Sequence, residues 1–368
     1  MKVGQTVQFA LLLQMRLSRK PGELDSLPYF LQIRLSRKPG KLSSLPYFLQ
    51  IRLSRKPGKL DSLPYSFRGR FMRNQVLGCI LGGAIGDAMG VPHEGERPPI
   101  EISDSDKWRL SDDTQLTLAT CEAISSCSGS VDPAVIADRF TEWHRASRVT
   151  GMGASTYKAL SELAAGGHWA LVGRKGDRAA GNGAAMRAAP LAFCLDPDDE
   201  AARRTIRDVC RITHHHEEAY AGALAVVTAV RAAASGLWDG SNNLLRLVAQ
   251  VLPDAQTRDR LIALAGIEEE TSLREIARRF GCSGYVVESV PLALCGASRI
   301  QRLGFKTVLM ELIACGGDTD TNSSIAGQVM GALIGRKRLP NEMISRTPES
   351  DTIETIAGAF AESINFYE

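Results

Sequence analysis

Apolar residues recur at helical spacing through most of the chain beyond residue 72. Segments such as EEAYAGALAVVTAVRAAA have apolar side chains on so many sides that they are typical of buried helices. Convincing strands with alternating apolar and polar residues are scarce. The pattern predicts an all-α body that folds as one compact helical bundle. Helices are expected at 113–125, 134–147, 154–165, 199–211, 217–235 and 243–252.

Glycines repeat every four residues in two apolar segments. On a helix, such a repeat forms a smooth face that allows another backbone to approach closely. We therefore expect both segments to be central helices of the bundle, with GGDTDT at the entrance of the second. The repeats are Gly78, Gly82, Gly86 and Gly90 in the first segment, and Gly327, Gly331 and Gly335 in the second.

Residues 1–71 form a repetitive basic leader. Near-identical copies of LQIRLSRKPGKLDSLPY recur every 18 residues, and each contains prolines that interrupt regular structure. Near-identity indicates recent duplication of the coding DNA, or translation of a repeat upstream of a start at Met72. We expect an appendage without a fold of its own, followed by a single domain over 72–368. A basic arm that binds a partner protein is the alternative.

The charge is unevenly divided between leader and body. Residues 1–71 hold 14 basic and 3 acidic residues, which leaves 30 basic and 38 acidic residues in the body. An acidic body lacks the basic stripe of a nucleic-acid binder. No apolar run reaches the roughly 18 residues that a membrane span requires. The eight scattered cysteines, without a C-x-x-C pair, predict a reduced cytoplasmic protein. We expect a monomer.

Two short acidic clusters carry the candidate chemistry. CGGDTDTNSSIAG, residues 315–327, and LSDDTQLTLAT, residues 110–120, each place carboxylates and hydroxyls at the start of an apolar helical run. Either cluster alone could be an ordinary helix cap. Together they offer four carboxylates without histidine or cysteine, and such oxygen ligands suit Mg²⁺ or Mn²⁺. Four carboxylates are enough for two divalent cations, which could orient a substrate and activate water.

With these clusters in place, the sequence resembles the ADP-ribosylglycohydrolase family. SDDT and GGDTDT are accompanied, in the family's order, by GAIGDAMGVPHEG, GNGAAMRAAPL, THHHEEA and GYVVESVPLAL. The resemblance covers about residues 72–340. It implies an all-α enzyme with two Mg²⁺ or Mn²⁺ ions that removes ADP-ribose from a modified protein side chain, with arginine the first candidate.

The resemblance also implies roles for individual residues. The implied metal ligands are Ser111, Asp112, Asp113, Asp318, Asp320 and Thr321, and the implied catalytic residues are Glu94, Asp113 and Asp320. Implied ADP-ribose contacts are Asn182, Gly183, Met186, His214 and Tyr285. Because neighbouring side chains on a helix point in different directions, three adjacent histidines cannot share one zinc ion. His215 and His216 are therefore expected on the surface or in packing.

The sequence departs from the family pattern in places that bear on the substrate. Gly151 stands where several arginine-directed members have aspartate, and Gln115 stands where many have glutamate. The choice between arginine and serine linkages therefore stays open. Hydrolysis of a small ADP-ribosyl compound, a silent ADP-ribose-binding or structural protein, and an immunity protein against an ADP-ribosylating toxin are the alternatives.

Overall fold

The computed structural model describes residues 29–36, 48–55, 65–240 and 244–364, with side-chain surroundings from Arg73 onward. The chain divides into two units, Met1–Arg68 and Gly69–Glu368.

The first unit contains one antiparallel strand pair. Strands β1 (Tyr29–Ser36) and β2 (Phe48–Arg55) pair with Tyr29 opposite Arg55. Both strands contain the repeated LQIRLS, in which apolar and polar residues alternate as in a strand. An isolated two-stranded pair is at best marginally stable in water. The pair therefore adds one local strand pairing to the leader.

The second unit is helical, as the periodicity predicted. The first half contains α2 (Tyr65–Gly90), η2 (Val91–His93), α3 (Asp112–Ser126), α4 (Pro133–Arg145), α5 (Ala154–Ala164), η3 (Asp177–Ala179), η4 (Ala189–Phe193), α6 (Glu200–Arg211) and α7 (Glu217–Ala234). The second half contains α8 (Leu244–Val251), α9 (Gln256–Leu264), α10 (Leu273–Phe280), α11 (Val286–Ala297), α12 (Ile300–Leu303), α13 (Phe305–Ile313), α14 (Thr319–Ile334), η5 (Arg336–Arg338), α15 (Asn341–Arg346) and α16 (Ser350–Ser363). Every helix expected from the pattern is present, within two residues at each end.

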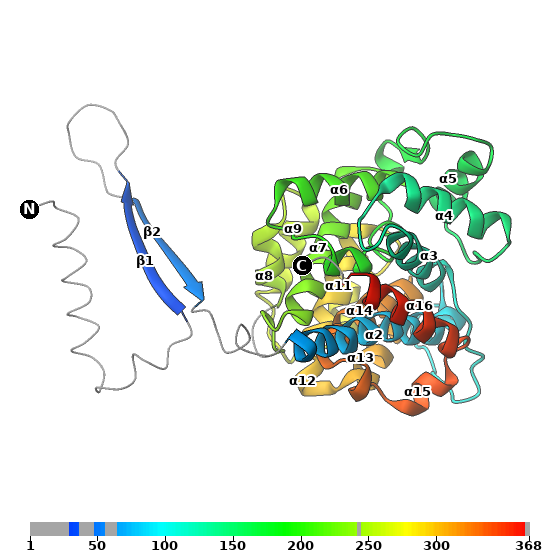
Figure 1. The fold of residues 1–368 in the computed structure, drawn as a ribbon. Helices are drawn as coiled ribbons and strands as arrows, with labels where there is room; N and C mark the ends of the chain where they lie inside the picture. The colour runs from blue at the N-terminus through cyan, green and yellow to red at the C-terminus, as the bar shows by residue number, and fades with distance from the viewer. Residues whose placement is uncertain (1–28, 37–47, 56–64, 241–243, 365–368) are drawn as a thin grey trace, which may run out of the picture. The chain divides into compact units, whose positions relative to one another are not determined.

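Helix α14 lies at the centre of the helical unit, in contact with α3, α7, α11 and α13 (Figure 1). The two glycine repeats meet, as expected, because α2 packs on α14 backbone to backbone. A Cβ added at Gly82 would collide with the carbonyl of Gly327, and one at Gly78 would collide with that of Gly331. Glycine at these positions is therefore required by the close approach of the helices.

Helix α2 also explains a feature of the hydropathy. Among the described residues, one segment, Arg73–His93, is long and apolar enough to cross a membrane by length and composition. However, 83% of its most apolar window is buried inside the fold. Its apolar character is that of a core helix.

Two short backbone pairings fix the loops around α14. The parallel pair β3 (Arg174–Lys175) and β4 (His214–His215) joins the segment after α5 to the segment before α7. An isolated bridge joins Gly181 to Tyr285. Loops that are distant in sequence are thereby held beside the N-terminus of α14.

Candidate active site

The start of α3 is organised by a carboxylate of α2. Asp87, fully buried, accepts hydrogen bonds from the backbone and hydroxyl of Ser111 and from the backbone and hydroxyl of Thr114. The Ser111 Oγ in turn accepts a hydrogen bond from the Asp113 amide at 3.2 Å and so caps the helix. These bonds fix the backbone at the start of α3 and therefore the direction in which the Asp112 and Asp113 side chains point.

The start of α14 meets the start of α3. Asp318 is the N-cap residue of α14, and Asp320 and Thr321 lie in its first turn. The Thr321 hydroxyl donates to Asp113 Oδ2 at 3.2 Å, across 208 residues of sequence. The expected convergence of SDDT and GGDTDT is therefore present in the fold.

Glu94, just after η2, completes the acidic cluster. One carboxylate oxygen each from Glu94, Asp318 and Asp320 lies within 4.8 Å of the others. Nearby, the buried Oδ1 of Asp113 has no hydrogen-bond partner among the described residues. Converging carboxylates and an unpartnered buried oxygen fit a hard divalent cation, which prefers oxygen ligands. These residues could hold such an ion.

Crowding makes these carboxyl groups hard to ionise. Burial, reinforced by the charge of Asp87, raises the pKa of Asp112 to about 8. Burial and the charge of Asp318 raise the pKa of Asp320 to about 10. Burial and Asp320 raise the pKa of Asp113 well above its usual value, and burial and Asp318 raise that of Glu94. A bound cation would offset this repulsion and favour the ionised forms.

The GNGAAM segment lies directly against the acidic cluster. The Asn182 side chain donates to Asp318 Oδ2 at 2.6 Å, and its backbone amide donates to the Gly284 carbonyl. A Cβ at Gly183 would lie 2.8 Å from the His214 ring, which explains the need for glycine there. The carbonyl of buried Met186 accepts a hydrogen bond from Gln328 of α14. The loop is thus tied to α14 at both ends.

The three adjacent histidines have three different environments. His214 is buried and borders the cleft, with Nδ1 2.8 Å from the Thr213 hydroxyl. His215 is half-buried and donates from Nε2 to the Val172 carbonyl. His216 accepts from the Glu218 amide and caps α7. The structural roles expected for the second and third histidines are confirmed.

A cleft of about 560 Å³ joins these parts. This volume is in the range of small-molecule sites. Among the described residues, Ser111 and Tyr285 do not line it: Ser111 is buried beneath, and Tyr285, 36% exposed, lies next to the lining residue Gly284. The other expected site residues line the cleft: Glu94, Asp112, Asp113, Asn182, Gly183, Met186, His214, Asp318, Asp320 and Thr321.

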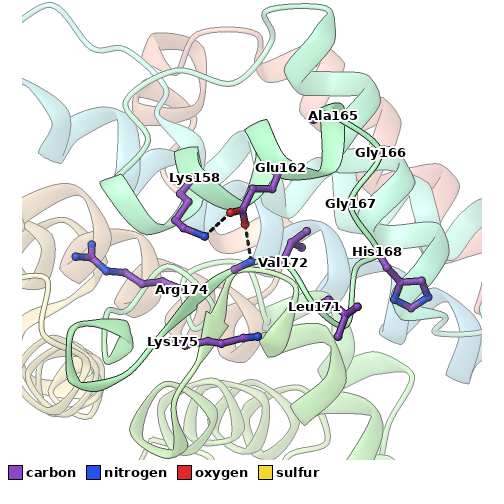
Figure 2. A pocket seen from close by; sticks show the side chains of 11 residues that line it. Lys158, Glu162, Ala165, Gly166, Gly167, His168, Leu171, Val172, Arg174 and Lys175 are labelled. Atoms are coloured by element: carbon purple, nitrogen blue, oxygen red, sulfur yellow. Dashed lines mark hydrogen bonds and ion pairs between the residues drawn. The ribbon is translucent and has the colours of Figure 1, made fainter.

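A larger hollow of about 1030 Å³ lies beside the cleft, between α5 and β3. Figure 2 shows Glu162 at its upper wall, bonded to Lys158. The Glu162 carboxylate also accepts a hydrogen bond from the backbone amide of Gly173. This hollow contains none of the converging carboxylates. Arg174 lines both spaces. We place the candidate active site in the smaller cleft, because its side chains can support chemistry.

The two positions expected to depart from the family pattern are close to each other, and one of them, Gly151, lines the cleft. The Gln115 side chain accepts from the Thr150 amide at 2.7 Å and donates to the Thr150 hydroxyl at 3.1 Å. The next residue, Gly151, has φ of +79° and lines the cleft beside Ser111. Gln115 therefore positions the loop that contains Gly151.

Sequence reasoning missed four residues of this site. Asp87 could have been suspected, because GAIGDAMG places a lone carboxylate in an otherwise apolar helix. Arg174 gave no sequence signal, and it is the one Lys or Arg among the described residues that line the cleft. Arg187 and Thr213, which are buried behind His214, could only be found once the fold had brought them together.

Comparison with known proteins shows the family to which the chain belongs. The model of the ADP-ribosylglycohydrolase family matches residues 70–366. The ADP-ribosyl-dinitrogen reductase glycohydrolase of Rhodospirillum rubrum is 25% identical over 300 residues, which cover 76% of this chain and 92% of that protein. The ADP-ribosylarginine hydrolase Tri1 of Pseudomonas putida is 27% identical over 299 residues, which cover 76% of each protein.

A solved structure has a similar fold. It is described as an ADP-ribosylglycohydrolase-related protein complex, and it matches with a TM-score of 0.63 at 25% identity, covering 79% of this chain and 98% of its own. This chain therefore belongs to the ADP-ribosylglycohydrolase family, and it is an enzyme of that class. The resemblance inferred from the motifs is confirmed.

Proposed function

We propose that this enzyme is a metal-dependent hydrolase that removes ADP-ribose from a modified protein side chain, with an arginine linkage as the first candidate. The observation that carries the proposal is the meeting of SDDT and GGDTDT in one cleft, through the Thr321–Asp113 hydrogen bond and the Glu94, Asp318 and Asp320 cluster. Relatives named for glycohydrolase and ADP-ribosylarginine hydrolase activity support the substrate class.

We assign metal binding to the oxygen ligands at the two helix starts. Two Mg²⁺ or Mn²⁺ ions, when bound, would supply Lewis-acid stabilisation of ribose hydroxyls and of a water molecule. The assigned ligands are Ser111, Asp112, Asp113, Asp318, Asp320 and Thr321.

The protein's own groups suit cleavage of a ribosyl bond. Breaking the bond at the anomeric carbon passes through an oxocarbenium-like state, which nearby carboxylates stabilise. We assign this role to Asp113 and Asp320, which both line the cleft. Glu94 is the carboxylate at the exposed end of the cluster, and its raised pKa suits it to accept a proton from attacking water and release it afterwards.

The rest of the cleft lining suits the ADP portion. Asn182, Gly183 and Met186 provide a close-fitting loop, and Arg174 and His214 can face the diphosphate. Tyr285, beside the cleft, is assigned to the adenosine end. We propose a cytoplasmic monomer whose partner is the ADP-ribosylated protein.

Gly151 supports a second substrate possibility. A residue without a side chain leaves room where several arginine-directed members place an aspartate. Serine-linked ADP-ribose, or a small ADP-ribosyl compound, therefore remains the alternative substrate of the same site.

The test is release of ADP-ribose from arginine-linked, serine-linked and small-molecule substrates. Metal-free protein should be inactive, and addition of Mg²⁺ or Mn²⁺ should restore turnover. Asp320→Ala should abolish turnover while the helical content is retained, and Asp138→Asn, on an exposed face of α4, should behave as wild type. Absence of release from every substrate with either ion would refute the proposal.

A further inference from the structure

His214 separates the cleft from a buried polar pair. Its side chain is 3% exposed, and its Nδ1 lies 2.8 Å from the Thr213 hydroxyl. The opposite edge of the ring faces the glycine loop, because a Cβ at Gly181 would lie 3.1 Å from Nε2. His214 is among the residues that line the cleft. Whether Nε2 carries a proton therefore decides whether the ring can donate a hydrogen bond to a ligand or only accept one.

Behind Thr213 lies Arg187, which is only 1% exposed. Its Nη2 donates to the Thr213 hydroxyl oxygen at 2.8 Å and to the Val209 carbonyl at 3.3 Å, and its guanidinium lies over the Phe140 ring. A guanidinium can only donate hydrogen bonds. The Thr213 oxygen is therefore an acceptor in its contact with Arg187.

The remaining hydrogen of this hydroxyl needs an acceptor, since Thr213 is 0% exposed. Among the described residues, Nδ1 of His214 is the one acceptor within hydrogen-bonding distance of that hydroxyl. If Nδ1 carried the imidazole proton, the Thr213 O–H would be buried without a partner, which is unfavourable. Arg187 therefore donates to the Thr213 oxygen, and the Thr213 hydroxyl donates to Nδ1 of His214.

We infer that Arg187 and Thr213 are positioning residues that hold His214 as the neutral tautomer with its proton on Nε2, so that it donates to an oxygen of a bound diphosphate. The identity of this ligand rests on the function proposed above. The tautomer is a property of the free protein.

The tautomer matters because only one ring nitrogen carries a proton. Burial, reinforced by the charges of Arg187 and Arg174, lowers the pKa of His214 to about 3, so the ring is neutral near pH 7. With its proton on Nε2, a neutral imidazole attracts a phosphate oxygen. With the proton on Nδ1, it would present a lone pair to that oxygen and repel it.

The direct test is nuclear magnetic resonance of the free protein labelled with ¹⁵N-histidine. Loss of signals in His214→Gln assigns the ring, and the long-range ¹H–¹⁵N pattern then reports the tautomer. We expect the Nε2–H tautomer alone in wild type and in Thr213→Ser. In Thr213→Val, the Nε2–H pattern should no longer be the single pattern observed for His214. Thr120→Val is the matched control, since Thr120 is equally buried and its hydroxyl donates to the Leu116 carbonyl of its own helix. An Nδ1–H pattern in wild type would overturn the inference, even if Thr213→Val failed to fold.

Calorimetric binding of free ADP-ribose provides the second readout. Thr213→Val should bind about 10- to 100-fold more weakly, the effect of losing a hydrogen bond to a charged group, whereas Thr213→Ser and Thr120→Val should match wild type. Wild-type affinity in Thr213→Val would overturn the role of the tautomer in binding. If neither wild type nor any variant bound ADP-ribose, the proposed function would fail. An Nε2–H spectrum would still establish that Thr213 donates to Nδ1 of His214.

Discussion

Replacing Asp112 with asparagine should stabilise the metal-free enzyme at alkaline pH. Asp112 is 5% exposed and faces the charges of Asp87, Asp318 and Glu94. Its pKa of about 8 in the folded protein lies above the ordinary value of 3.8. The folded state therefore binds a proton more tightly than the unfolded state, and stability is lost as pH rises from about 4 to about 8.

The size of the effect follows from the same two pKa values. About four pKa units, at about 1.4 kcal/mol each, give a penalty on the order of 5 kcal/mol at pH 8 for ionising Asp112 in the metal-free fold. Asparagine is similar in shape and cannot ionise, so Asp112→Asn escapes this penalty. The two proteins should have equal free energies of unfolding near pH 4. Between about pH 4 and about pH 8, the free energy of unfolding of the variant should increasingly exceed that of wild type.

The assay is urea unfolding at several pH values, first in a chelator and then with saturating Mg²⁺ or Mn²⁺. A cation at 100 times its dissociation constant should stabilise wild type by about 2.7 kcal/mol. The variant should gain less, because it has lost one of the proposed ligands. Asp138→Asn, an exposed change on α4, is the control for loss of one negative charge. If Asp112→Asn matched this control at pH 8 in chelator, the electrostatic reasoning would be refuted.

Three further predictions concern the frame around the site. Asp87→Asn should weaken Mg²⁺ or Mn²⁺ binding about 10- to 100-fold, since Asp87 orients the start of α3, and calorimetry showing unchanged affinity would contradict this. Gly82→Ala should lower the free energy of unfolding by about 1–3 kcal/mol or more, because its Cβ meets the backbone of α14. Gly153→Ala, with open space around its Cβ, should leave chemical denaturation unchanged, and equal effects of both changes would refute the close-packing argument. Deleting residues 1–71 should preserve turnover and melting temperature, and a truncated protein that unfolded would show the leader to be integral.

Much of the helical fold could be predicted because its signals are local. Residues 217–235, for example, have the apolar breadth of a buried helix, and the structure has α7 at Glu217–Ala234. The glycine repeats also predicted a close contact, since few other patterns demand a face without side chains. The alternation in LQIRLS was visible too, but the prolines on either side obscured the strands of the leader.

The site was predictable only in part. SDDT and GGDTDT stand out because their acidic residues lie at the starts of apolar helices. Arg174 is ordinary in sequence and gains its place through the pairing of β3 with β4. Arg187 and Thr213 meet through tertiary packing, and no local pattern distinguishes a buried arginine that orders a hydroxyl from one on the surface.

The backbone contact between α2 and α14 has a consequence for how this enzyme can change. It extends to the site, because a Cβ at Gly90 would meet the backbone of Asp320. No layer of side chains lies between the helices at these points to absorb a shift by adopting other rotamers. The position of Glu94, which follows α2, relative to Asp320 of α14 is therefore set largely by main-chain contact. Substitutions in the outer helices can therefore change the free energy of unfolding while the distance between Glu94 and Asp320 stays constant. Stability and site geometry can then change independently.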